Sequence, residues 1–128
     1  TCGMAPEDVF LMLCFDGTRI VHVTLHVSVA QALRLLTRER ITRAILSADA
    51  ALKRLGVAAP RIAVGGLNPH AGEGGPFGAE GDAVTAPAIA DAVAQGARAE
   101  GPFGADTMFH KRGYDAFTVM LHDQGHIA

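Results

Sequence analysis

Apolar and polar positions fall into short blocks that predict strands and helices in turn. The apolar runs 10–15 and 19–25 flank the Asp-Gly pair at 16–17, a strong signal for a hairpin of two antiparallel strands. Residues 61–67 predict a third strand, and its continuous apolar run is typical of a strand covered on both faces of a sheet. Residues 116–121 predict another strand.

Apolar residues at helical spacing extend over residues 28–56. Ser28 and Gln31 fit a capping box at the start of this segment, and Gly56 is a natural stop at its end. Thr37 leaves open whether the segment forms one helix or two. In either case, helical structure separates the hairpin from the strand at 61–67.

A further helix is predicted over residues 83–95, with Pro87 in its first turn, where a missing backbone N–H does no harm. Residues 97–103 are compatible with a short strand, and residues 106–110 with a helical turn. Because strands alternate with helices, we expect residues 1–128 to form a single α/β domain.

Composition narrows the classes of function. The chain has 128 residues, of which 49% are hydrophobic and 19% charged, with a net charge of -2, which suits a soluble globular domain. Without a basic block to neutralise phosphates, nucleic acid is not expected as a partner. No apolar stretch reaches the roughly 18 residues that cross a bilayer, so no membrane association is expected.

The two cysteines indicate neither a metal site nor a disulfide framework. We expect Cys14 to be a buried thiol within its apolar run. A reducing, cytoplasmic setting follows from this cysteine usage. The chain begins at Thr1 and ends at Ala128 in mid-pattern, which predicts a piece of a longer protein.

Three histidines occupy equivalent positions, each shortly after a predicted strand. They are His26, His70 and His122. In open α/β sheets, ligands bind beyond the carboxyl ends of the strands. Three imidazoles converging there could hold a divalent cation and leave coordination positions open. We prefer this interpretation to one in which each histidine only bonds a backbone carbonyl.

The loop at 68–75 is rich in glycine and surrounds His70 with polar groups. Glu73 in this loop is either a ligand or a carboxylate bonded to nearby backbone amides. His22 is expected to pack in the sheet or meet solvent, and His126 has no special context.

Two carboxylates are candidate catalytic residues. Asp123 directly follows His122. Asp106 precedes Thr107, and both an N-cap role and a role beside a metal or substrate remain open for it.

Four stretches carry a recognisable signature. They are residues 61–78 (RIAVGGLNPHAGEGGPFG), 101–102 (GP), 105–109 (ADTMF) and 120–125 (MLHDQG). In order and approximate spacing they closely resemble the 4-hydroxythreonine-4-phosphate dehydrogenases of vitamin B6 synthesis, over nearly the whole chain.

The resemblance implies a three-layer α/β/α fold like that of the isocitrate and isopropylmalate dehydrogenases. Residues 1–128 would be the central, dimer-forming one of two domains, without its flanking substrate domain. The implied cofactors are NAD or NADP and a divalent metal, zinc, magnesium or cobalt. The implied reaction oxidises a small phosphorylated 3-hydroxy acid, and the resulting β-keto acid loses carbon dioxide.

The resemblance also assigns roles by position. The family's three metal-binding histidines, drawn from both subunits of a homodimer, correspond to His26, His70 and His122. Asp106 would orient a water or a ligand, and with Asp123 it completes the expected catalytic residues. The match at His26 is looser than elsewhere, because a leucine precedes it where the family pattern has threonine.

Departures from the family pattern leave the substrate open. His126-Ile127-Ala128 follows the last motif where an apolar residue and a proline are expected. Close relatives act on 4-phospho-D-threonate or 4-phospho-D-erythronate, and another oxidises a dihydroxy-cyclohexadiene dicarboxylate.

A second hypothesis is a metal-binding dimerisation module without turnover, which suits the 128 residues alone. A metal-dependent hydrolase fits the motifs less well.

Overall fold

The computed structural model describes residues 3–72 and 79–128. Glu73, with its two possible roles, lies outside the described residues. The described elements, with η for a 3-10 helix, are η1 (Pro6–Asp8), β1 (Met12–Phe15), β2 (Thr18–His22), α1 (Val29–Leu35), α2 (Arg38–Arg54), β3 (Arg61–Gly65), η2 (Pro69–Gly72), α3 (Glu80–Ala94), β4 (Arg98–Phe103), η3 (Met108–His110), β5 (Ala116–Val119) and α4 (His122–His126).

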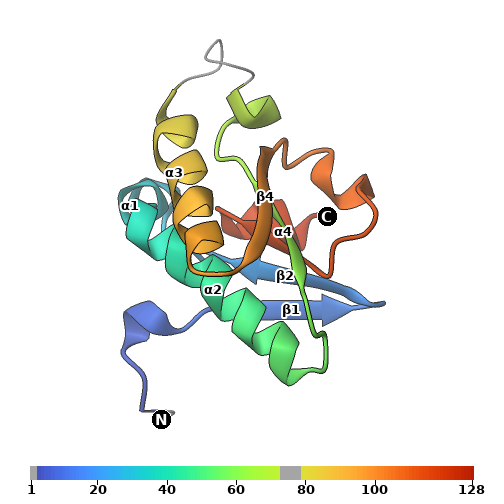
Figure 1. Cartoon of the computed structure of the whole chain (residues 1–128). Helices are drawn as coiled ribbons and strands as arrows, with labels where there is room; N and C mark the ends of the chain where they lie inside the picture. The colour runs from blue at the N-terminus through green and yellow to red at the C-terminus, as the bar shows by residue number, and fades with distance from the viewer. Residues whose placement is uncertain (1–2, 73–78) are drawn as a thin grey trace.

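Within the described residues, the strands form one five-stranded sheet in the order β1-β2-β5-β3-β4 (Figure 1). β1 pairs antiparallel with β2, and the other neighbours pair in parallel. Parallel pairing requires crossover connections, which α1, α2 and α3 supply. The carboxyl ends of β2, β5 and β3 therefore meet at one edge of the sheet.

The β1–β2 hairpin confirms the turn expected from the Asp-Gly pair. Asp16 and Gly17 have φ values of 44° and 80°, the left-handed conformation that a two-residue hairpin turn requires. The prediction of a buried Cys14 is wrong, because its side chain is exposed. Among the described strands, β1 is an edge strand paired with β2 alone, so an apolar sequence there does not ensure burial.

The helical segment after the hairpin forms two helices, which settles the question left open at Thr37. The Ser28 hydroxyl accepts a hydrogen bond from the Gln31 amide at 3.2 Å, as the capping pattern predicts. Thr37 caps α2 in the same way, with its hydroxyl accepting from the Arg40 amide at 3.2 Å. A threonine cap therefore restarts the helix in a new direction.

The position of Pro87 differs from the expectation. It lies inside α3, not in the first turn, because the helix begins at Glu80. A proline inside a helix removes one backbone hydrogen bond. Packing of α3 against α2 compensates for this loss: Ala88 is fully buried, and its carbonyl accepts from the Thr42 hydroxyl at 3.2 Å.

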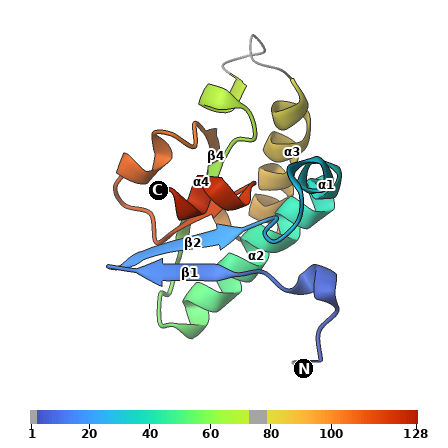
Figure 2. The same ribbon diagram turned by 180° about the vertical axis from the view of Figure 1, so that it is seen from behind.

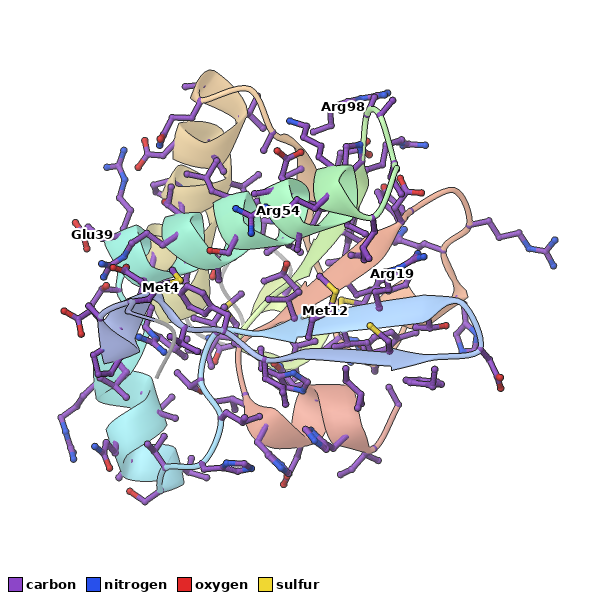
Figure 3. The ribbon with its side chains drawn as sticks, turned by 90° about the horizontal axis from the view of Figure 1, so that it is seen from below. Met4, Met12, Arg19, Glu39, Arg54 and Arg98 are labelled. Atoms are coloured by element: carbon purple, nitrogen blue, oxygen red, sulfur yellow. The ribbon has the colours of Figure 1, made fainter. Side chains whose placement is uncertain are left out.

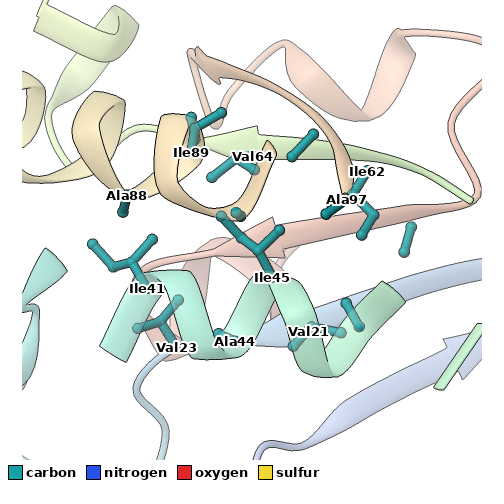
Figure 4. Packing of buried hydrophobic residues seen from close by; sticks show 14 of the residues in the cluster. Val21, Val23, Ile41, Ala44, Ile45, Ile62, Val64, Ala88, Ile89 and Ala97 are labelled. Atoms are coloured by element: carbon teal, nitrogen blue, oxygen red, sulfur yellow. The ribbon is translucent and has the colours of Figure 1, made fainter. Parts of the chain in front are cut away.

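The two faces of the sheet carry separate apolar clusters, since successive side chains of a strand point to opposite faces. α2 and α3 cover one face, and Figure 4 shows their side chains over β2 and β3. The apolar cluster on this face includes Val21, Val23, Ile41, Ala44, Ile45, Ile62, Val64, Ala88 and Ile89. The other face packs under η3 and consists of Ile20, Ala63, Met108, Phe117 and Val119.

The expected α/β fold is thus confirmed. Figure 3 shows α2 on one side of the β1–β2 hairpin and α4 on the other. α4 lies beside β2, at the edge where the central strands end (Figure 2). η3 and α4 lie on the face of the sheet opposite α2, and α4 itself contains His122 and Asp123.

Candidate functional site

Polar contacts tie the ends of β2 and β5 together just before the histidines. The Thr24 hydroxyl donates to the Met120 carbonyl at 2.7 Å, and the Thr24 amide donates to the same oxygen at 3.2 Å. Thr24 is only 2% exposed, so these bonds are shielded from water. They fix the relative position of the two chain segments that lead to His26 and His122.

A second polar link joins β5 to β3. Gln124 accepts hydrogen bonds at Oε1 from the amides of Met120 and Leu121, at 2.9 Å and 3.0 Å. Its Nε2 donates to the Gly66 carbonyl at 3.0 Å. α4 is thereby anchored to both strands, and with it the backbone of His122.

His26 and His122 lie near each other across a cleft. Their ring centroids are 5.9 Å apart, and the rings are inclined by 45°. The cleft has a volume of about 450 Å³ and is also lined by Thr24, Ser28 and Asp123. Two of the three predicted histidines are therefore brought together within one chain.

Asp123 holds the ring of His122. Its Oδ1 lies 2.7 Å from Nδ1 of His122. An ionised carboxylate only accepts, so Nδ1 is the donor in this contact and Nε2 is the ring nitrogen left for another partner. A carboxylate bonded to one ring nitrogen is the usual support of a histidine whose other nitrogen binds a metal.

His70 is paired with Asp106, the other predicted carboxylate. Its Nδ1 lies 3.4 Å from Oδ2 of Asp106. The alternative N-cap role of Asp106 is wrong, because Thr107 occupies the N-cap position of η3. The prediction of a helical turn there is confirmed.

The loop that carries His70 has an unusual backbone. His70 and Ala71 have φ values of 52° and 55°, which are uncommon for residues other than glycine. Two glycines adjoin this loop: a Cβ on Gly66 would lie 2.9 Å from Cα of Ala71, and one on Gly104 would lie 3.4 Å from Cα of His70 and 2.7 Å from Oδ1 of Asp106. Glycines therefore bring this loop against the segment that carries Asp106.

The structure does not gather all three histidines in one chain. Across residues 3–72 and 79–128, no three His, Cys, Asp or Glu side chains form a group that could hold a metal ion. A second cleft, of about 450 Å³, is lined by Asp106 and Asp123 together with Phe109 and Gln124. Asp123 lines both clefts and so links the His26–His122 pair to Asp106.

Two histidines that the sequence did not single out belong to the same region. The ring of His126 is stacked on that of His122, with centroids 4.0 Å apart and planes within 6°. His22 is buried, and its ring centroid lies 4.7 Å from that of His126. Burial, together with the nearby His126 and His122, lowers the pKa of His22 to about 4. The spacing of 122 and 126 on one helical face was the available signal.

No helix in the described part of the chain combines the length and apolarity needed to cross a membrane.

The family described as "Pyridoxal phosphate biosynthetic protein PdxA" matches residues 2–128. A 1,2-dihydroxy-3,5-cyclohexadiene-1,4-dicarboxylate dehydrogenase from Comamonas sp is 47% identical over 98% of this chain and 40% of its own length.

Two further relatives carry other names. A Clostridium botulinum protein named "Putative D-threonate 4-phosphate dehydrogenase" is 44% identical over 95% of this chain and 37% of its own length. The crystal structure of a 4-hydroxythreonine-4-phosphate dehydrogenase from Klebsiella pneumoniae is 44% identical, with a TM-score of 0.88 over 92% of this chain and 37% of that one. The chain therefore spans about two-fifths of the length of these relatives.

Proposed function

The chain belongs to the PdxA family, and on this premise we propose that it forms part of an NAD(P)- and divalent-metal-dependent dehydrogenase of a phosphorylated 3-hydroxy acid. The observation that carries the proposal is the His122–Asp123 pair facing His26 across a cleft at the carboxyl edge of the sheet. The proposal concerns a protein of the relatives' length, since the chain spans 37% to 40% of them.

The donor set fits a divalent cation. Two histidines that share a tetrahedral cation, with metal–nitrogen distances of about 2 Å, have ring centroids roughly 5 to 6 Å apart. The separation of 5.9 Å between His26 and His122 agrees with this. His70 carries a carboxylate at its Nδ1 side, as His122 does. A bound cation would supply Lewis-acid stabilisation of the negative charge that develops on a substrate oxygen.

We propose that two copies of the chain complete the site as a homodimer, with His70 contributed by the partner. The separation of the described histidines into a His26–His122 pair and a His70–Asp106 pair supports this arrangement. We also expect the isolated 128 residues to behave as a metal-binding dimerisation module without turnover.

The two carboxylates have separate roles in the proposal. Asp123 accepts a hydrogen bond from Nδ1 of His122 and so leaves Nε2 as the ring nitrogen available to a metal. Asp106 orients His70 and faces the second cleft, where it can position a water molecule or a substrate hydroxyl. Gln124 anchors α4 to the ends of β5 and β3, and with it Asp123.

The names of the relatives suggest candidate substrates. One candidate is the 4-hydroxythreonine-4-phosphate of the Klebsiella pneumoniae enzyme. A second is 4-phospho-D-threonate, which the name of the Clostridium botulinum relative supports, or the related 4-phospho-D-erythronate. We place the reaction in the cytoplasm, as the resemblance and the low cysteine content support.

The test is an assay of NAD⁺ and NADP⁺ reduction by the full-length protein with each candidate acid, before and after chelation of divalent metal. We expect turnover with one phosphorylated acid, loss of turnover on chelation and recovery with Zn²⁺, Mg²⁺ or Co²⁺. His122→Ala should lower turnover by at least about a hundredfold, whereas the exposed His110→Ala is the matched control. Metal-independent turnover would refute the proposal.

A further inference from the structure

The ring of His126 is fixed in two ways on α4. It lies flat against the ring of His122, one helical turn away, at 4.0 Å and 6°. Its Nδ1 lies 3.1 Å from the His122 carbonyl oxygen, so this nitrogen carries the proton and donates to that oxygen. An exposed side chain loses rotamer freedom in such an arrangement, and the sheet core gains little from it.

A buried histidine of β2 supports this stack from the other side. The ring of His22 contacts that of His126 with a centroid distance of 4.7 Å, whereas its distance to His122 is 6.5 Å. Neither nitrogen of His22 has a hydrogen-bond partner among the described residues.

The absence of a side chain at Gly125 leaves the space that the ring of His22 occupies. A Cβ at this position would lie 2.9 Å from Cγ2 of Ile20 and 3.0 Å from Cε1 of His22, and closer still to Nε2 of His22. These contacts are tighter than side chains tolerate. The glycine therefore lets α4 approach β2 closely enough for the rings of His22 and His126 to meet.

His122 is consequently held at two places, its edge and its face. Asp123 binds Nδ1 at 2.7 Å and fixes the proton. A single hydrogen bond still permits the ring to rotate about it, whereas a parallel ring at 4.0 Å restricts its plane. Groups that orient a metal-binding histidine commonly change metal affinity by 10- to 100-fold when they are removed.

We propose that His126 is a positioning residue, whose stacked ring fixes the plane of His122 so that Nε2 faces the cleft shared with His26. This inference rests on the proposed function, since it concerns the residue that the proposal assigns to the metal. It needs no contact between His126 and the substrate. Its distinguishing feature is that the flat ring matters and the ring nitrogens do not.

The test uses two substitutions with opposite chemistry in the full-length protein. His126→Phe keeps a flat ring and removes the hydrogen bond, whereas His126→Gln keeps a donor and removes the ring. Co²⁺ binding is measured by titration and by the visible absorption of the bound ion, together with kcat, KM and the melting temperature. His122→Ala serves as the reference for loss of the ligand and His110→Ala as the surface control.

We expect His126→Gln to weaken Co²⁺ binding by about tenfold or more and to change the absorption spectrum, with the loss of turnover in kcat. His126→Phe should stay within about threefold of the unsubstituted protein in affinity, with the same spectrum. Equal Co²⁺ affinity and spectra for His126→Gln and the unsubstituted protein would overturn the inference. If His122→Ala also binds Co²⁺ normally, the proposed function fails as well, so the two failures are distinguishable.

Discussion

Gln124 donates from Nε2 to the carbonyl of Gly66 at 3.0 Å, and this bond joins α4 to the end of β3. Oε1 of the same side chain accepts from the amides of Met120 and Leu121. One amide side chain thus satisfies three backbone groups at the edge where the candidate site lies. Only glutamine among the common side chains combines this reach with both a donor and two acceptor lone pairs.

We therefore expect Gln124→Ala to lower the free energy of unfolding by about 2 to 3 kcal/mol, because it leaves partly buried backbone groups without partners. Urea denaturation followed by circular dichroism measures this change. Gln95→Ala is the matched control, since that side chain bonds an exposed carbonyl on α3 and its loss should cost less than about 0.5 kcal/mol. Similar effects of both substitutions would contradict the anchoring role of Gln124.

His22 predicts a specific pH dependence of stability. Burial lowers the pKa of its ring from 6.5 to about 4 in the folded chain. The unfolded chain therefore binds a proton between these values and the folded chain does not, so stability is complete above about pH 6.5 and falls as the pH drops toward 4. A shift of this size corresponds to a loss of about 3 kcal/mol. The titratable groups that face His22 are His126 and His122 on α4, and both contribute to the lowered pKa.

The measurement is the free energy of unfolding at steps of half a pH unit between pH 4 and 7, with a chelator present. His22→Leu should flatten the curve over this range, because an apolar side chain of similar volume has no proton to bind. His110→Ala leaves the curve unchanged, since that residue is exposed on η3. A slope that persists in His22→Leu would assign the pH dependence to other groups.

Thr118 is a further position where burial and hydrogen bonding conflict. Its side chain is fully buried on β5, and its hydroxyl has no partner among the described residues. Thr118→Val keeps the shape and removes the unsatisfied group, so it should raise the free energy of unfolding by about 1 kcal/mol.

Thr42→Val is the matched control for this prediction. The hydroxyl of Thr42 is also buried, but it donates to the carbonyls of Arg38 and Ala88. Its replacement should lower the free energy of unfolding by about 1 kcal/mol. Thermal or urea unfolding of the two variants should therefore shift in opposite directions. A destabilising Thr118→Val would show that the hydroxyl contributes to the fold.

Features of this chain that depend on local chemistry could be predicted from its sequence. The turn at Asp16-Gly17 and the cap at Ser28 are examples, because neighbouring residues determine both. The exposure of Cys14 could not be predicted, since it depends on β1 being an edge strand. The same holds for Pro87, which α3 retains inside the helix because it packs on α2.

In the candidate site too, features set by local sequence could be predicted, whereas contacts between separate elements could not. His26 and His122 were predicted from their positions after strands, and the structure places them across one cleft. The i, i+4 spacing of His122 and His126 was a signal that they share a helical face, but the contact of His126 with His22 depends on how α4 packs on β2 and could not be predicted. Side chains from separate elements meet there, and no short motif encodes such a meeting.

The division of the histidines into two groups predicts a pattern of complementation between subunits. If His70 comes from the partner, a His70→Ala chain and a His122→Ala chain are each inactive as homodimers. A mixed dimer of the two contains one intact site and one doubly substituted site. The purified mixed dimer should then show roughly half of the turnover of the unsubstituted protein, and the randomly assembled mixture before purification roughly a quarter. Co-expression of differently tagged full-length chains, tandem purification and the NAD(P)⁺ reduction assay measure this recovery.

The informative control is the combination of His26→Ala with His122→Ala. These residues line one cleft of the same chain, with ring centroids 5.9 Å apart, so every site in their mixed dimer lacks one of the two. We expect no recovery above the homodimers. Recovery in this pair, together with none in the His70 pair, would mean that His26 and His122 of one site come from different chains. The cleft between them would then not be the metal site.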